Sequence, residues 1–314
     1  MVLLMFLGSL PSVVVMIATS LILLPLGQIR LNRYIIDSIG CAWYRIPIAF
    51  FEALFGMRMV FSGDALNTSD RVVLICNHRT RLDWMFLWAF LGRFGRLQNF
   101  KIYIKRSLRN LPGPGWAMQF LGFFFLHRKW EKDEAMITSL LEHYADIDYP
   151  LQLLIFPEGT NLTLDTRNKS HSFAATQGLS STWHVLLPRT LGFTHQVQLS
   201  RARDAVDAIY DITIAFGGRV PVKETQLLTG HLPQEVHFHV RRYPIHIVPR
   251  DVAKLQQWCI DRFVEKENRL THYARCGSLA MPEDMPPSPL LSLSLSYPSC
   301  KSRFISSSSS IVLG

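Results

Sequence analysis

The sequence predicts an α/β domain attached to a membrane by an apolar N-terminal segment. Residues 2–27 contain no charged side chain, and from about residue 63 short apolar runs alternate with helical segments. Only 18% of the 314 residues are charged, yet the net charge is +9. This composition excludes a wholly disordered or collagen-like chain. The basic excess favours anionic partners, such as phospholipid head groups or phosphorylated cofactors.

The apolar run at residues 2–27 is longer than the roughly 20 residues that a spanning helix needs. No basic residue precedes the run, which argues against a cleaved signal peptide. We therefore expect a transmembrane anchor over residues 1–28. Because Arg30 and Arg33 follow the run, we expect that end in the cytosol and the N-terminus in the lumen.

A second apolar stretch, Ile39–Phe61, carries Arg45, Glu52 and Arg58. Charges are costly on a helix that faces lipid, so an interfacial or re-entrant helix competes with a full crossing. The sequence leaves both arrangements open. It predicts a second membrane-associated helix over residues 29–62.

Residues 63–276 are expected to form the folded domain, because strand-like and helical patterns alternate there. The predicted strands are Arg71–Cys76, Lys101–Ile104, Gly122–Leu126, Leu151–Phe156, Val185–Leu187, Asp211–Ala215 and Val236–Val240. The predicted helices are Trp84–Gly92, Ser107–Gln119, Lys132–Asp146, Ala202–Tyr210 and Val252–Tyr273.

Residues 277–314 are rich in Ser, Pro and Leu and show no helical or strand period. We expect this tail to be disordered. The five cysteines of the chain form no CxxC pair. This spacing argues against a disulfide framework or a cysteine zinc site and favours a reducing, cytosol-facing compartment.

One polar segment, Cys76–Asp83, follows a predicted buried strand. It places His78 in the turn after the strand and Asp83 about one helical turn further on. This spacing can bring a carboxylate to one imidazole nitrogen and leave the other nitrogen free to accept a proton. The competing interpretation is a capped helix start, with Asp83 in the first turn.

Three further segments follow apolar runs. Phe156–Thr160 places Glu158 in a loop at a strand end. There the glutamate either binds hydroxyls or orients a basic group, or it belongs to an ordinary Pro-Glu-Gly turn. Gly122–Arg128 ends in an arginine that either meets a phosphate or lies on the surface. Val185–Thr190 either lines a hydrophobic pocket or, as the pattern favours, fills the core.

Together, these four segments resemble the glycerolipid acyltransferase superfamily of the lysophosphatidic acid acyltransferase type. The first is similar to its NHxxxxD block, the second to FPEGT, the third to GxxFxxR and the fourth to its apolar-proline block. The resemblance covers roughly residues 63–250. It implies an α/β acyltransferase domain with a mixed sheet flanked by helices.

The resemblance also implies roles for individual residues. His78 would be the general base, and Asp83 would orient it. Arg128 and Glu158 would hold the phosphate-bearing glycerol end of the acceptor, with Gly159 and Thr160 shaping that loop. One departure is Asn161, where many relatives carry a basic or small residue, and this puts the head-group preference in doubt. A second departure is the tail, since close relatives continue into further membrane segments.

The resulting expectation is an acyl-CoA:lysophospholipid O-acyltransferase of the endoplasmic reticulum membrane, with its catalytic domain facing the cytosol. Its acceptor would be anionic: lysocardiolipin, lysophosphatidylinositol, lysophosphatidylglycerol or lysophosphatidate. Acyl-CoA is a co-substrate, and no cofactor is expected. The basic cluster of Lys101, Lys105, Arg106, Arg109, Arg128, Lys129 and Lys132 suits anionic lipid and CoA phosphates.

Competing functions are less well supported. A catalytically silent membrane-bound isoform is the alternative that the unusual tail suggests, although His78 and Asp83 are intact. A serine-type lipid hydrolase lacks a GxSxG motif. Nucleic acid binding lacks a recognition motif. His237 and His239 alternate along a predicted strand without further ligands in register, so no metal site is expected.

Overall fold

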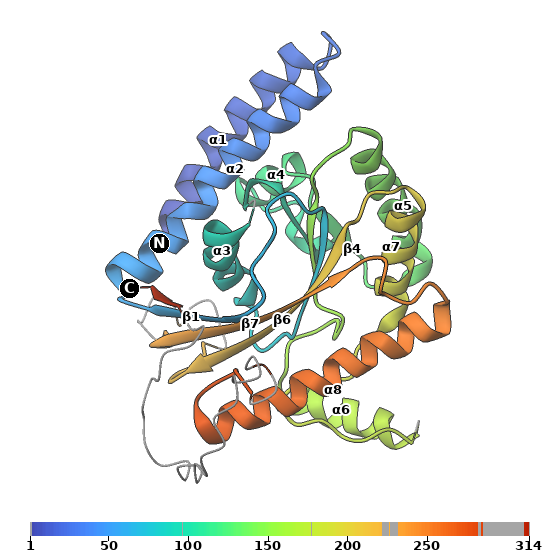
Figure 1. Ribbon diagram of the computed structural model, residues 1–314. Coiled ribbons are helices and arrows are strands. Elements are labelled where there is room, and N and C mark those ends of the chain that lie inside the picture. The colour runs from blue at the N-terminus through green and yellow to red at the C-terminus, as the bar shows by residue number, and fades with distance from the viewer. Residues whose placement is uncertain are drawn as a thin grey trace, which may run out of the picture.

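The computed structural model describes residues 2–95, 97–176, 178–221, 226, 232–281, 284 and 311–313. A mixed sheet with the strand order β4-β3-β5-β2-β6-β7-β1-β8 forms its centre. The strands are β1 (Arg58–Gly63), β2 (Val72–Cys76), β3 (Phe100–Lys105), β4 (Phe124–Leu126), β5 (Gln152–Ile155), β6 (Ala208–Gly217), β7 (Glu235–Pro244) and β8 (Ile311–Leu313). Helices cover both faces of the sheet (Figure 1). The predicted α/β class and mixed sheet are therefore confirmed.

The helices divide between the two faces. α2 (Ile29–Ala49) and α3 (Asp83–Phe94) pack on one face, in a core that contains Val72 and Leu74 of β2. α5 (Trp130–Asp146), α7 (Thr190–Ala202) and α8 (Val252–Cys276) pack on the other. The remaining helices are α1 (Val2–Leu23), α4 (Pro114–Phe120) and α6 (Leu164–Thr176), with short η1 (Phe50–Leu54), η2 (Leu97–Asn99) and η3 (Arg106–Leu108). β2 is apolar at every position because both of its faces are covered.

The predicted strand at Val185–Leu187 is wrong. This segment is not part of the sheet, because side chains rather than a neighbouring strand bind its backbone N–H groups. Val185 donates to Glu267 at 3.1 Å, and Leu187 donates to Ser170 Oγ at 3.1 Å. An apolar run flanked by turn residues does not show whether its backbone N–H groups bond to a neighbouring strand or to side chains.

The predicted helix at Ala202–Tyr210 is also wrong. α7 ends at Ala202, and the chain turns through Asp204, whose φ is 47°. The Asp207 carboxylate then accepts from the backbone N–H of Arg71 at 2.7 Å and holds the start of β6 beside β2. Helices α6 and α7 were not predicted. The Ser107–Gln119 prediction contains η3 and α4, which are separated by a turn.

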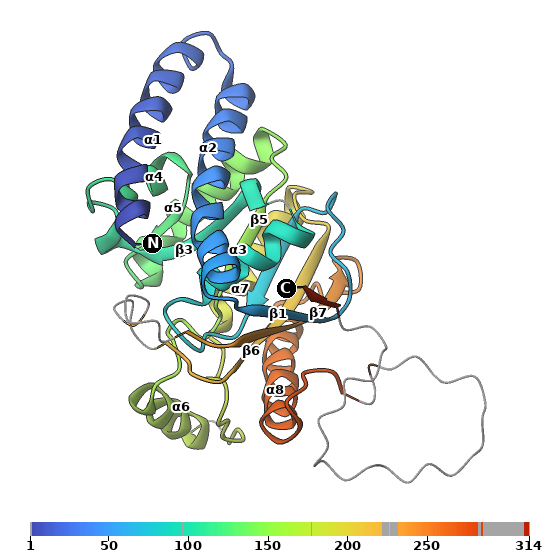
Figure 2. The same cartoon turned by 90° about the vertical axis from the view of Figure 1, so that its left-hand side faces the viewer.

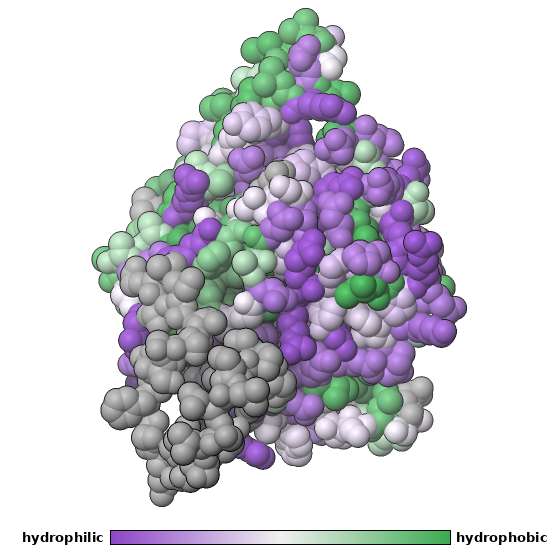
Figure 3. Space-filling view, in the orientation of Figure 1, coloured by the Kyte–Doolittle hydropathy of each residue, from purple (hydrophilic) through white to green (hydrophobic). Residues whose placement is uncertain are grey.

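The N-terminal helices α1 and α2 lie side by side as a hairpin that projects from the domain (Figure 2). In the described residues, only one helix is long and apolar enough to cross a membrane, over Phe6–Leu23 in α1. The predicted helix over 29–62 is wrong at its end, because β1 joins the sheet parallel to β7. Apolar side chains gather over the hairpin in the space-filling view (Figure 3).

A buried ionic network attaches α2 to the sheet. Lys101 on β3 donates to Asp37 on α2 at 2.9 Å and to the Tyr149 hydroxyl at 2.8 Å. Arg33 donates to both oxygens of Asp37, at 2.9 and 2.7 Å. Burial lowers the pKa of Lys101 to about 8, although Asp37 opposes this shift. Lys101 is therefore part of the protein interior and not of the basic face on which the sequence placed it.

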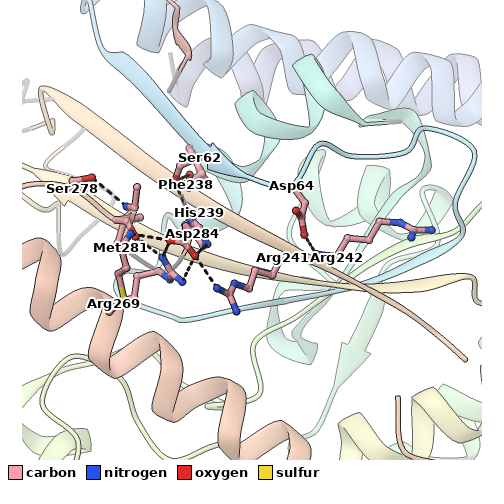
Figure 4. Close-up of polar contacts among 12 residues, drawn as sticks. Ser62, Asp64, Phe238, His239, Arg241, Arg242, Arg269, Ser278, Met281 and Asp284 are labelled. Carbon is pink, nitrogen blue, oxygen red and sulfur yellow. Dashed lines mark hydrogen bonds and ion pairs between the residues drawn. The ribbon is translucent and has the colours of Figure 1, made fainter. Parts of the chain in front are cut away.

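The first residues of the predicted disordered tail are ordered against β7 and α8. Asp284 binds Arg241 at 2.7 Å and accepts from the backbone N–H of Met281 at 2.8 Å, and Leu279 is buried (Figure 4). β8 pairs antiparallel with β1. The prediction of disorder is wrong for these residues, and the remainder of the tail lies outside the described residues.

Candidate active site

Parallel strands bring the predicted site segments to one edge of the sheet. β2, β5, β3 and β4 are parallel neighbours, so their carboxyl ends share one edge. His78 follows β2, Glu158 follows β5 and Arg128 follows β4. Neighbouring strands are about 4.8 Å apart, so the ends of β2 and β4, which His78 and Arg128 follow, are three spacings apart, about 14 Å.

His78 and Asp83 form a pair. His78 Nδ1 lies 2.9 Å from Asp83 Oδ2, and the same oxygen accepts from the backbone N–H of Thr80 at 2.9 Å. Burial raises the pKa of Asp83, although its bond to His78 opposes this shift. An ionised carboxylate only accepts hydrogen bonds, so the imidazole proton lies on Nδ1. His78 Nε2 has no partner among the described residues and is available to a substrate.

The His78 ring is held on a second side by Phe156. The two rings stack with their centroids 4.2 Å apart. The carbonyl of His78 accepts from the backbone N–H of Leu162 at 2.7 Å. The imidazole is therefore fixed by contacts from both the NHxxxxD and the FPEGT segments.

Glu158 lies beneath the site and not on its open surface. Its side chain is buried. Its Oε1 accepts from the backbone N–H of His78 at 2.7 Å, and its Oε2 accepts from that of Leu186 at 2.8 Å. Burial raises the pKa of Glu158 to about 8, against the lowering effect of these two bonds. This carboxyl group joins three of the four predicted segments, a geometry that suits positioning of His78 better than contact with the acceptor.

Gly159 and Thr160 complete the turn after β5. The backbone N–H of Gly159 donates to Phe156 at 2.9 Å. The φ of Gly159 is 70°, a left-handed conformation that glycine adopts without strain. Gly159 is exposed and Thr160 is half-buried, so both are placed to line the site. Their contact with substrate stays a prediction.

Arg128 lies in a basic hollow of about 440 Å³ at the ends of β3 and β4. The hollow is lined by Lys105, Arg106, Ser107, Asn110, Leu126, His127, Arg128, Lys129 and Lys132. The φ of Arg128 is 64°, and Asp133 supports this turn by accepting from the backbone N–H groups of His127 and Lys129. No carboxylate in the described residues pairs with Arg128, which leaves its guanidinium open to an anion.

Sequence reasoning missed two contributors. Glu267 on α8 accepts from the backbone N–H groups of Trp183, His184 and Val185 and fixes the fourth segment. Arg189 lies against the turn at Gly159, and its backbone N–H donates to Pro157 at 2.7 Å. A basic residue directly after the apolar run and its proline was the signal for Arg189, whereas nothing in the sequence marked Glu267.

Other clusters in the described residues do not suit metal binding. No group of three or more His, Cys, Asp or Glu side chains within them is arranged to hold an ion. His237 lies 3.0 Å from Glu235, and His239 lies 3.0 Å from the Ser62 hydroxyl. Burial lowers the pKa of His239 to about 3, so it stays neutral there.

Comparison with protein families agrees with this geometry. The acyltransferase family matches residues 58–216, from the start of β1 into β6, a range that contains His78, Asp83, Arg128 and Glu158. A second match, to the acyltransferase C-terminus, covers residues 226–297. The chain belongs to the acyltransferase family.

Individual acyltransferases are similar over most of this chain. Lysocardiolipin acyltransferase 1 of Gallus gallus is 47% identical over 245 residues, which cover 78% of this chain and 65% of that protein. Lysocardiolipin acyltransferase 1 of Mus musculus is 45% identical and covers 80% and 67%. Lysophosphatidylinositol acyltransferase 10 of Caenorhabditis elegans is 38% identical and covers 78% and 63%. The chain thus spans about two thirds of the length of these relatives.

Proposed function

We propose that the chain transfers a fatty acyl group from acyl-CoA to a hydroxyl of a lysophospholipid. The observation that carries this proposal is the His78–Asp83 pair, which leaves Nε2 without a partner in the described residues and lies on the same edge of the sheet as Arg128 and the basic hollow. The family match and the names of the relatives support it. Nothing in the site or in these relatives supports the catalytically silent alternative.

In the proposed reaction, His78 Nε2 removes the proton of the acceptor hydroxyl. The alkoxide oxygen attacks the thioester carbonyl and forms a C–O bond. The C–S bond then breaks, and the departing sulfur of CoA takes the proton from His78. Asp83 stabilises the imidazolium that exists between these steps. The reaction balances without a metal, a redox cofactor or an acyl-enzyme.

The proposed acceptor is an anionic lysophospholipid. The hollow around Arg128 is lined by several cationic side chains and no acidic one. Guanidinium groups bind phosphate oxygens through paired hydrogen bonds. The members of the proposed class that carry such phosphates are lysocardiolipin, lysophosphatidylinositol, lysophosphatidylglycerol and lysophosphatidate.

The proposed location is the endoplasmic reticulum membrane, with the catalytic domain on the cytosolic side. α1 supplies the apolar surface, and most of its residues from Phe6 to Leu23 are exposed in the fold. The basic hollow suits a negatively charged leaflet, and acyl-CoA must reach the site from the side on which it is dissolved. Membrane attachment therefore holds the site close to its lipid substrate.

The direct test is an acyl-CoA assay on washed membranes that contain the protein, with a panel of lysophospholipids and with monoacylglycerol as the phosphate-free acceptor. We expect acyl-CoA-dependent acylation of at least one anionic lysophospholipid and a much lower rate with monoacylglycerol. Equal rates with and without a phosphate would contradict the proposed acceptor class. No acylation of any acceptor would contradict the reaction.

A further inference from the structure

Arg128 follows the edge strand β4 and is the site residue farthest from His78 in the strand order. The free hydroxyl and the phosphate of a lysophospholipid are joined to the same glycerol, only a few bonds apart. A phosphate next to the reacting hydroxyl must therefore lie close to His78. The ends of β2 and β4 are three strand spacings apart, about 14 Å.

Arg189 lies against the turn that follows β5, the strand next to β2. Its Cδ is 3.4 Å and its Nε is 3.6 Å from the point that a Cβ on Gly159 would occupy, so the side chain rests on the glycine. Glu158, the neighbour of Gly159, binds the backbone of His78. Because β5 adjoins β2, Arg189 lies about one strand spacing from the His78 turn.

The Arg189 side chain is exposed and has no ionic partner in the described residues. Its backbone is nevertheless fixed, because the N–H donates to Pro157 at 2.7 Å. Trp130, two residues after Arg128, lies 3.9 Å from the Cβ position of Gly192, three residues after Arg189. The two arginines therefore come from neighbouring loops, with Arg189 on the side of His78.

We propose that Arg189 binds the substrate phosphate nearest to the reacting hydroxyl. This proposal rests on the proposed acyltransferase function. The chemistry that Arg189 recognises is an organic phosphate. The phosphate of the acceptor fits the position beside His78, and the phosphates of CoA are the other possible source.

The test compares Arg189→Ala and Arg189→Lys with the parent and with Arg203→Ala. Arg203 is the matched control, since it is an exposed arginine at the other end of α7 and pairs with Glu142. The KM for lysophosphatidate, the KM for acyl-CoA and kcat are measured for each protein. Binding of lysophosphatidate, relative to monoacylglycerol, is measured in detergent micelles without acyl-CoA.

We expect Arg189→Ala to raise the KM for lysophosphatidate about 10- to 100-fold, the effect of losing a hydrogen-bonded ion pair. Arg189→Lys should lose less, and Arg203→Ala should match the parent. A rise only in the KM for acyl-CoA would assign the bound phosphate to CoA. Unchanged KM values for both substrates in Arg189→Ala would overturn the proposal.

The binding measurement separates this proposal from the proposed reaction. If the parent acylates no acceptor, the proposed function fails. Arg189 is then judged on binding, where phosphate-dependent affinity lost in Arg189→Ala supports the proposal and affinity equal to the parent overturns it. Monoacylglycerol binding should be the same in all four proteins, because this lipid offers no phosphate.

Discussion

The buried carboxyl group of Glu158 accepts a hydrogen bond from the backbone N–H of His78 at 2.7 Å. Through its other oxygen, the same group accepts from the backbone N–H of Leu186. The backbone beneath the base is therefore tied to two other loops, while the imidazole is oriented separately by Asp83. The glutamate of the FPEGT segment thus positions the base by binding its backbone, a role that the sequence pattern did not indicate.

Glu158→Gln is expected to lower kcat about 10- to 100-fold with little change in either KM, since it displaces the base without removing a substrate contact. An amide oxygen accepts, but the amide nitrogen would face a backbone N–H, so one of the two bonds is lost. Steady-state kinetics with lysophosphatidate and acyl-CoA check this. A selective rise in the KM for the acceptor would instead support the substrate contact that the family resemblance implies.

The same variant tests the pKa of Glu158, which burial raises to about 8 from an unfolded value of about 4.3. Between these pH values the folded protein keeps a proton that the unfolded chain has released. Glu158 therefore makes the free energy of unfolding fall as the pH rises through this window. Thermal unfolding of solubilised protein should show a shallower decline with pH in Glu158→Gln than in the parent.

Asp83→Asn is expected to reduce kcat about 10²–10⁴-fold while the protein stays folded. One oxygen of Asp83 accepts both from the backbone N–H of Thr80 and from His78, and an amide oxygen can do the same, but the amide carries no negative charge to stabilise the imidazolium. The rate is compared at matched expression, with Asp165→Asn on exposed α6 as the control. A rate within about threefold of the parent would show that Asp83 only caps α3.

Lys101→Met is expected to destabilise the protein by about 1–3 kcal/mol, because Asp37 loses a buried hydrogen-bond donor while Arg33 still pairs with it. Lys105→Met is the control on the same strand, where the side chain is exposed and a change within about 0.5 kcal/mol is expected. Denaturant or thermal unfolding of solubilised protein measures both. Equal stability of the two variants would show that the link between α2 and the sheet contributes little.

Cytosolic placement predicts that the sequons at Asn67, Asn161 and Asn168 carry no glycan. The protein should therefore keep its gel mobility after N-glycosidase treatment, and protease added to sealed microsomes should digest the catalytic domain. A microsomal glycoprotein treated in parallel is the positive control for N-glycosidase activity. A glycan on Asn161 or Asn168 would place the domain in the lumen.

Much of the sheet could be predicted from sequence because its strands are continuous apolar runs, as at Leu151–Phe156. The errors have a common cause. At Val185–Leu187 the backbone is satisfied by side chains distant in sequence, such as Glu267, and no local pattern records such partners. In the second apolar stretch, the apolar residues of β1 pack in the core of the domain. Their apolar character, which suggested contact with the membrane, is explained by burial inside the protein.

The positions of the site residues could be predicted where the spacing of residues in the sequence determines which side chains meet. His78 and Asp83 are five residues apart and meet across one turn. Arg128 could be placed at a strand end, and its open position follows from the turn that Asp133 supports. The burial of Glu158 depends on tertiary contacts that spacing does not encode. For the same reason, Lys101 was assigned to a basic face although it lies in the core.

The most direct test of the central claim is the rate of acyl transfer from acyl-CoA to lysophospholipid by His78→Ala. Washed membranes with equal amounts of parent and variant protein are compared on the acceptor that the parent uses best. Loss of the base at His78 should reduce the rate about 10²–10⁴-fold, while the protein remains in the membrane at normal abundance. A near-normal rate in His78→Ala would contradict the assignment of His78 as the base and, with it, the proposed mechanism.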